Sequence, residues 1–314
     1  MVLRALQSVG LVCASALLAA IGLTHAEVKL AAGNSAAASS AIVESPARAE
    51  VEKLIHDSGA DVAVAFRTLD TPPQELMLNQ DEAFHAASTM KVPVMIELFA
   101  DAHAGKLRLD DTLLIKNEFH SIVDGSVFQL DPKDDSDEEV YKAIGTSWTL
   151  HQLCVAMITK SSNLATNLII EKLGVENIQA RVHLLGADGM HVLRGVEDGK
   201  AFQAGRNNTT TANALYVLMR AIALHSACDP DSCSEMLDIL EGQTFNEAIP
   251  AGLPPGTLIA HKTGEITGVH HDAAIVFGKR PFVLVILVKG IDDRNKSSAL
   301  MAAIAKAIYE GSQH

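Results

Sequence analysis

The sequence predicts an α/β fold in which an antiparallel sheet, flanked by N- and C-terminal helices, lies beside an all-helical subdomain. Segments of strand character occur near both ends of the chain, at 61–79 and 257–290, whereas residues 88–245 are mostly helical with long loops. Helical patterns follow position 45 and cover 297–310. Both chain ends therefore contribute to one sheet, and a cleft is expected between the sheet and the helical insertion.

Length and composition indicate a globular protein. The chain has 314 residues, of which 48% are hydrophobic and 20% charged, which allows a sizeable core in one large or two modest domains. Its formal net charge is -13 at pH 7. Because the phosphates of nucleic acid would repel such a surface, neither nucleic acid nor an anionic membrane is expected as a partner.

The N-terminal segment has the pattern of a targeting sequence. Residues 1–26 contain a positive charge, an apolar run over 9–23 and the ending Thr-His-Ala, which is typical of a secretory signal peptide cleaved near residue 26. An uncleaved anchor is the alternative, although the run is short for a full span. The Ala/Ser/Gly-rich stretch 27–44 predicts a flexible linker before a folded domain at 45–314. We therefore expect a secreted protein of the bacterial periplasm, without stable membrane association after cleavage.

The individual elements of the sheet can be predicted in order. Ser45-Pro46 suits an N-cap and first helical position, and that helix ends at the Asp-Ser-Gly of 57–59. The expected strands have β-branched content and Gly or Pro punctuation, and they cover 61–69, 74–79, 257–263, 272–278 and 282–290.

The cysteines and one acidic run are expected to have structural rather than catalytic roles. Cys154 lies in an apolar run and is expected to be a buried, inert thiol. Cys228 and Cys233 lie in the loop-like stretch CDPDSC, where an oxidising compartment favours a small disulfide. A metal site there would need further ligands. The run 131–142 is most simply a solvated loop.

The stretch 86–93, Ala-Ala-Ser-Thr-Met-Lys-Val-Pro, opens a helical run. Helical spacing puts Ser88 and Lys91 on one face near the helix start, where free N–H groups suit an oxyanion. Lys91 would activate the hydroxyl if burial or positive charge lowered its pKa. Taken alone, the pair is better explained as a helix cap beside a surface lysine. Pro93 favours a tight or 3₁₀ first turn.

Two further motifs change this assessment. Ser161-Ser162-Asn163 follows a helical segment, so that a second hydroxyl and an amide can reach into a cleft. Lys262-Thr263-Gly264 lies on a predicted strand, where a lysine can hold an anion and Gly264 permits close approach. The order S-x-x-K, S-x-N, K-T-G matches the active-site set of penicillin-recognising serine enzymes.

From about residue 46 to 309 the chain resembles a class A β-lactamase, a serine hydrolase related to the penicillin-binding transpeptidases. The stretches 250–264 and 207–215 also resemble the family's approach to its K-T-G strand and its helix start after the omega loop. The fold class is accordingly β-lactamase/transpeptidase-like.

The resemblance implies a mechanism. Ser88 would attack the lactam carbonyl with Lys91 as base or proton relay, and Ser161 would pass a proton to the lactam nitrogen. The backbone N–H groups of Ser88 and Glu265 would form the oxyanion hole.

The resemblance also implies the residues that bind substrate. Asn163 would hold the substrate's side-chain amide, and Lys262 and Thr263 would bind its carboxylate. His271 falls near the position of an arginine that often helps to bind the carboxylate. A charged His271 would do the work of that arginine, whereas a neutral His271 is simply a strand histidine. No cofactor and no metal are expected.

Deacylation is where the sequence departs most from the family, which uses an omega-loop glutamate in the motif E-x-x-x-N. Here Val196 stands at the glutamate position, Glu197 is one residue late, and Ala201 stands four after Glu197 where asparagine is expected. The Gly-rich loop would let the backbone shift so that Glu197 points inward. The alternative is a surface Glu-Asp pair on a mobile loop.

Other departures are smaller. Ser162 replaces the acidic middle residue of S-D-N and so removes a buried charge that normally braces the loop, and Asn208 stands where aspartate is usual. Glu265 puts a carboxylate where small residues are common and would repel an anionic substrate. Met95 occupies the position of the family's disulfide partner for Cys154, so that thiol should be free.

The predicted function is β-lactam hydrolysis through a Ser88 acyl-enzyme, catalysed by a monomer. One alternative is a penicillin-binding-protein-like peptidase, or an esterase, that acylates and then stalls. Another is a protein that binds a β-lactam or peptidoglycan peptide without turnover.

Overall fold

The computed structural model describes residues 41–313. The expected signal peptide and most of the linker lie outside the described residues. Within them, Val43–Glu44 form strand β1, which pairs in parallel with β3. No helix among residues 41–313 has the length and apolar character needed to cross a bilayer.

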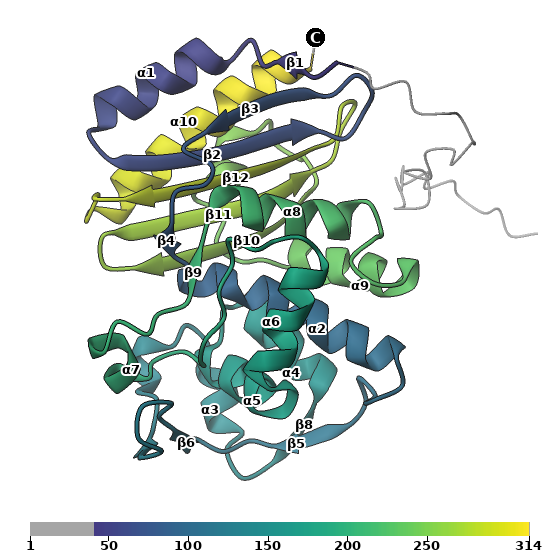
Figure 1. The fold of residues 1–314 in the computed structure, drawn as a ribbon, viewed down its shortest axis with the longest axis vertical. Coiled ribbons are helices and arrows are strands. Elements are labelled where there is room, and N and C mark those ends of the chain that lie inside the picture. Colours follow the sequence, from purple (N-terminus) through teal and green to yellow (C-terminus); the bar gives the residue numbers. More distant parts are fainter. Residues whose placement is uncertain (1–40, 314) are drawn as a thin grey trace, which may run out of the picture. The chain divides into compact units, whose positions relative to one another are not determined.

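One six-stranded sheet has the order β1-β3-β2-β12-β11-β10 (Figure 1). Antiparallel pairing of β12 with β2, in register from Phe282 opposite Thr68 to Lys289 opposite Asp61, joins the two ends of the chain. The single sheet predicted from the sequence is therefore confirmed, with β10 at its edge. Its longer strands are β2 (Asp61–Thr68), β3 (Gln74–Leu78), β10 (Ile259–Ile266), β11 (Val269–Val276) and β12 (Phe282–Lys289).

Helices cover both faces of the sheet (Figure 1). Helices α1 (Arg48–Ser58) and α10 (Arg294–Ser312) lie on one face, and α8 (Ala212–Ala223) lies on the other. Alternate side chains of β12 point to opposite faces of the sheet. Leu284 and Ile286 pack into the core under α1 and α10, whereas Val283 and Val285 pack into the larger core of the helical part. Burial on both faces explains why this strand is apolar throughout.

The helical part surrounds α2 (Lys91–His103), whose residues from Lys91 to Asp101 are all buried. A 3₁₀ turn, Ala87–Met90, precedes α2, as Pro93 predicted. The other helices are α3 (Glu138–Lys142), α4 (Leu150–Thr159), α5 (Asn163–Leu173), α6 (Val175–Leu184), α7 (Gly199–Gln203) and α9 (Pro230–Glu241). The short strands β4 (Phe84–His85) with β9 (Thr209–Thr210), β5 (Thr112–Leu114) with β8 (Ser147–Thr149), and β6 (Phe119–His120) with β7 (Val127–Phe128) form pairs.

The predicted Cys228–Cys233 disulfide is not formed, since both residues are free thiols. The stretch is not a loop: Asp229 is the N-cap of α9 and Pro230 its first residue, so Cys233 is buried inside the helix. The prediction for Cys154 is confirmed, because this residue is a fully buried free thiol whose pKa is raised by burial.

Candidate active site

The 3₁₀ turn sets Ser88 at the start of α2. The preceding residue, Ala87, has φ 46°, a left-handed conformation that L side chains rarely adopt. Edge strand β10 runs directly against this turn, because a Cβ added to Gly264 would lie only 3.0 Å from the backbone N of Ser88. Glycine at this position therefore lets the backbone of the strand reach the nucleophile candidate.

Lys91 is fully buried and held by the loop that precedes α5. Its Nζ donates to Ser161 O at 2.6 Å, to Ser161 Oγ at 3.1 Å and to Asn163 Oδ1 at 2.8 Å. Burial lowers the pKa of Lys91 to about 7, although Asp135 and Glu197 oppose the shift. Burial therefore favours the neutral amine, which is the form that a general base requires.

The Ser161 hydroxyl lies between two lysines. Lys262 Nζ donates to Ser161 Oγ at 3.1 Å, the same separation as for Lys91, and to Thr263 O at 2.8 Å. Burial, and then the charge of Lys91, lower the pKa of Lys262 well below its usual value. A hydroxyl flanked by two proton donors can relay a proton between them and a substrate atom.

Glu197 points into the same cluster. Asn163 Nδ2 donates to Glu197 Oε1, so one amide side chain bridges Lys91 and Glu197. Asn167 fixes the backbone of Val196 through two hydrogen bonds: its Nδ2 donates to Val196 O and its Oδ1 accepts from Val196 N. The next residue, Glu197, has a left-handed φ of 61°, which turns the Glu197 carboxylate inward. Burial raises the pKa of Glu197 to about 7.

The alternative of a surface Glu-Asp pair is excluded by the environment of both residues. Asp198 is 3% exposed, caps α7 through Ala201 N and accepts hydrogen bonds from Ser121 Oγ and Ile122 N. Asn208 fixes the start of the same loop through Leu193 N.

The acidic run 131–142 is not simply a solvated loop. Asp135 and Asp137 are 9% and 4% exposed. Asp135 Oδ2 accepts hydrogen bonds from Asn163 N and Leu164 N, both at 2.9 Å. Sequence reasoning missed this contact because nothing local to the run indicates which loop it faces.

The structure does not bring His271 into the cleft. Its side chain is fully buried on the helical face of the sheet, where Nε2 faces His85 O at 2.9 Å and burial lowers its pKa to about 4. Strand residues alternate between faces, so His270 faces the cleft instead, with Nδ1 2.8 Å from Ser297 Oγ. His270 rather than His271 therefore lines the cleft, and the expected position of His271 is wrong.

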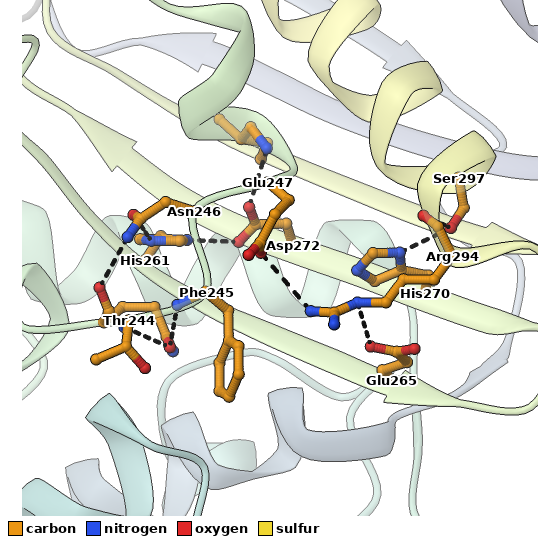
Figure 2. A network of polar contacts seen from close by, with 12 residues as sticks. Thr244, Phe245, Asn246, Glu247, His261, Glu265, His270, Asp272, Arg294 and Ser297 are labelled. Atoms are coloured by element: carbon orange, nitrogen blue, oxygen red, sulfur yellow. Dashed lines mark hydrogen bonds and ion pairs between the residues drawn. The ribbon is translucent and has the colours of Figure 1, made fainter. Parts of the chain in front are cut away.

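Beside His270, an arginine is held by two glutamates (Figure 2). Arg294 Nε lies 3.0 Å from Glu265 Oε2, and Arg294 Nη2 lies 3.6 Å from Glu247 Oε2. The guanidinium carbon also lies 5.9 Å from the ring centre of Phe245. Arg294, at the start of α10, was not among the residues expected from the sequence.

Two adjoining cavities meet at Ser88. One, of about 530 Å³, extends past Thr263 toward Arg294, and the other, of about 790 Å³, extends past Glu197 toward Phe202. Both are lined by Ser88, Asn163 and Glu265. All expected site residues except His271 thus lie in or directly behind one cleft between the sheet edge and the helical part.

Known proteins resemble this chain in sequence and in fold. Residues 46–311 match the Beta-lactamase enzyme family. The chain belongs to this family. A beta-lactamase of Bacillus licheniformis is 28% identical over 176 residues, which cover 54% of this chain and 57% of that one. Beta-lactamase OXY-2 of Klebsiella oxytoca is 27% identical over 263 residues, covering 81% and 85%.

The β-lactamase fold also appears among solved structures. A PBP-A mutant, solved as an acyl-enzyme complex with penicillin G, superposes with a TM-score of 0.72 at 25% identity, covering 84% of this chain and 95% of that one. The chain spans little more than half the length of the Bacillus relative and nearly all of this structural one. The predicted family and fold are therefore confirmed.

Proposed function

We propose that this β-lactamase-family chain hydrolyses the amide bond of β-lactams through an acyl-enzyme on Ser88. The observation that carries the proposal is the bridge made by Asn163, which joins Lys91 to Glu197. This bridge supports the assignment of two general bases beside one cleft. Lys91 would accept the proton of Ser88 when it attacks the lactam, and Glu197 would accept a proton from the water that attacks the acyl ester.

The remaining roles follow from position. The N–H groups of Ser88 and Glu265 form the oxyanion hole, since Gly264 brings β10 against the 3₁₀ turn. Ser161 protonates the lactam nitrogen as the ring opens. Thr263 and Lys262 bind the ring carboxylate. His270, which lines the same cavity as Thr263, helps to bind it in place of His271.

A chromogenic cephalosporin tests the proposal when intact mass is recorded during turnover. Steady colour formation without lasting adduct is the expected result. A second candidate is a penicillin-binding protein that acylates and stalls, and the likeness to the PBP-A acyl-enzyme structure favours it. A persistent adduct would support that candidate, and no adduct at all would overturn the shared mechanism.

Deacylation should depend on pH through Glu197. Asp134, Asp135, Asn163 and Lys91 face this carboxylate, and its raised pKa of about 7 means that it is protonated, and inactive as a base, at lower pH. The deacylation rate should be half-maximal near pH 7 and fall about tenfold for each pH unit below pH 6. Single-turnover measurements on preformed acyl-enzyme from pH 5 to 9 check this. A rate that stays constant down to pH 5 would contradict it.

Glu265 should disfavour anionic substrates. Its carboxylate forms an ion pair with the Arg294 guanidinium, on the side of the cleft where the ring carboxylate of the substrate is proposed to bind. Because this ion pair is about half exposed, Glu265→Gln should raise kcat/KM for a penicillin by about two- to fivefold. The methyl ester of the same penicillin should show no gain. Glu171→Gln, which removes a surface ion pair outside the cleft, is the control. An equal gain for acid and ester would rule out this role.

A further inference from the structure

Asp135 reaches the start of α5 from a separate part of the chain. Its Oδ2 accepts hydrogen bonds from Asn163 N and Leu164 N at 2.9 Å and lies 3.5 Å from Ser162 Oγ. Its other oxygen accepts from Asp137 N at 3.1 Å, which fixes the carboxylate. The first N–H groups of a helix have no partner within the helix, and a carboxylate satisfies them with charge-assisted bonds.

The loop anchored in this way determines the surroundings of Lys91. Ser161 supplies two of the three acceptors of the lysine, and Asn163 supplies the third. Ser161 has φ 58°, a strained conformation that persists only where its neighbours enforce it. Anchoring the next residues, 162–164, therefore controls where the Ser161 hydroxyl and the Asn163 amide lie.

We propose that Asp135 is a positioning residue for acylation of Ser88, and that it supplies from a separate loop the negative charge that Ser162 lacks. The inference rests on the proposed function, because acylation is the step that it supports. Asp135 and Ser162 form a matched pair: only 3.5 Å separates Asp135 Oδ2 from Ser162 Oγ, so one acid fits at either position and two would repel each other.

Three variants of the full chain test this pairing. Asp135→Asn keeps the shape but weakens the anchoring, and acylation by the chromogenic cephalosporin should slow by about 10- to 100-fold. Ser162→Asp alone should also slow acylation, because two carboxylates then crowd the helix start. The double variant should return to within about threefold of wild type, since an acid at the N-cap restores the negative charge at the helix start and can accept from Leu164 N. Glu139→Gln, in the same acidic run, removes an exposed carboxylate that pairs with Lys142, and it is the control.

A pH profile separates positioning from simple loss of folding. The charged groups around Lys91 are Lys262, Glu197 and Asp135, and the charge of Asp135 raises the pKa of this lysine. The pH of half-maximal acylation should therefore decrease in Asp135→Asn and return in the double variant. If the wild-type chain acylates and Asp135→Asn acylates at the same rate, this inference is wrong but the proposed function stands. The same conclusion follows if the double variant is folded but acylates no faster than the slower single variant. A wild-type chain that never acylates would overturn the proposed function and this inference together.

Discussion

Ser88→Ala should abolish turnover of a chromogenic cephalosporin and the accompanying increase in protein mass. Without the hydroxyl no acyl-enzyme can form at position 88, so the rate should fall by at least about 10³-fold. Lys91 and the Ser161 hydroxyl would remain in place, because their mutual hydrogen bond does not involve Ser88. Binding without reaction should therefore survive and can be measured by displacement of a fluorescent penicillin.

A matched serine provides the control for this experiment. Ser234→Ala removes a hydroxyl on α9 that bonds Pro230 O and lies outside both cavities, and it should leave the rate unchanged. An adduct of undiminished yield in Ser88→Ala would show that another hydroxyl is the nucleophile.

Glu197→Gln should trap the acyl-enzyme. An amide cannot accept a proton from the hydrolytic water, and loss of a general base costs about 10²- to 10⁴-fold. The hydrogen bond from Asn163 can still form to the amide oxygen, so Lys91 keeps its setting and acylation continues. Intact mass should then show one stoichiometric adduct that persists after free substrate is removed, and the colour change should stop after about one turnover.

Two results would contradict the assigned role. Unchanged turnover in Glu197→Gln would place the deacylating base elsewhere. A wild-type chain that accumulates the same adduct would mean that Glu197 does not activate water, and the penicillin-binding alternative would then be preferred. Asp188→Asn, which alters an exposed carboxylate beside His183, serves as the control.

The sequence predicted the parts of the site that depend on local motifs. Ser88 and Lys91 share a helix face because their spacing requires it, and strand alternation puts Lys262 and Gly264 on the side facing the helical part. The same alternation explains the error at His271. Its register with Gly264 depends on the length of the β10–β11 turn, which spacing within one strand does not reveal.

Contacts between distant loops were not predictable. The hydrogen bond between Asp135 and the start of α5 joins residues 28 positions apart, and acidic composition does not indicate such a partner. The orientation of Glu197 depends on one left-handed residue, enforced by the hydrogen bonds of Asn167 to Val196. Of the five non-glycine residues with positive φ among residues 41–313, three, Ala87, Ser161 and Glu197, carry or adjoin the groups proposed for catalysis.

The strand order has a consequence for biosynthesis. Lys262 is held on β10, whose only strand partner among residues 41–313 is β11. Strand β11 in turn pairs with β12, which must find β2 across more than two hundred residues of chain. Such long-range pairing is slow compared with local helix formation. During translation the Ser88 turn and the Ser161 loop are made long before Lys262, so a growing chain has no complete cleft until β12 and the start of α10, as far as Ser297, have been made.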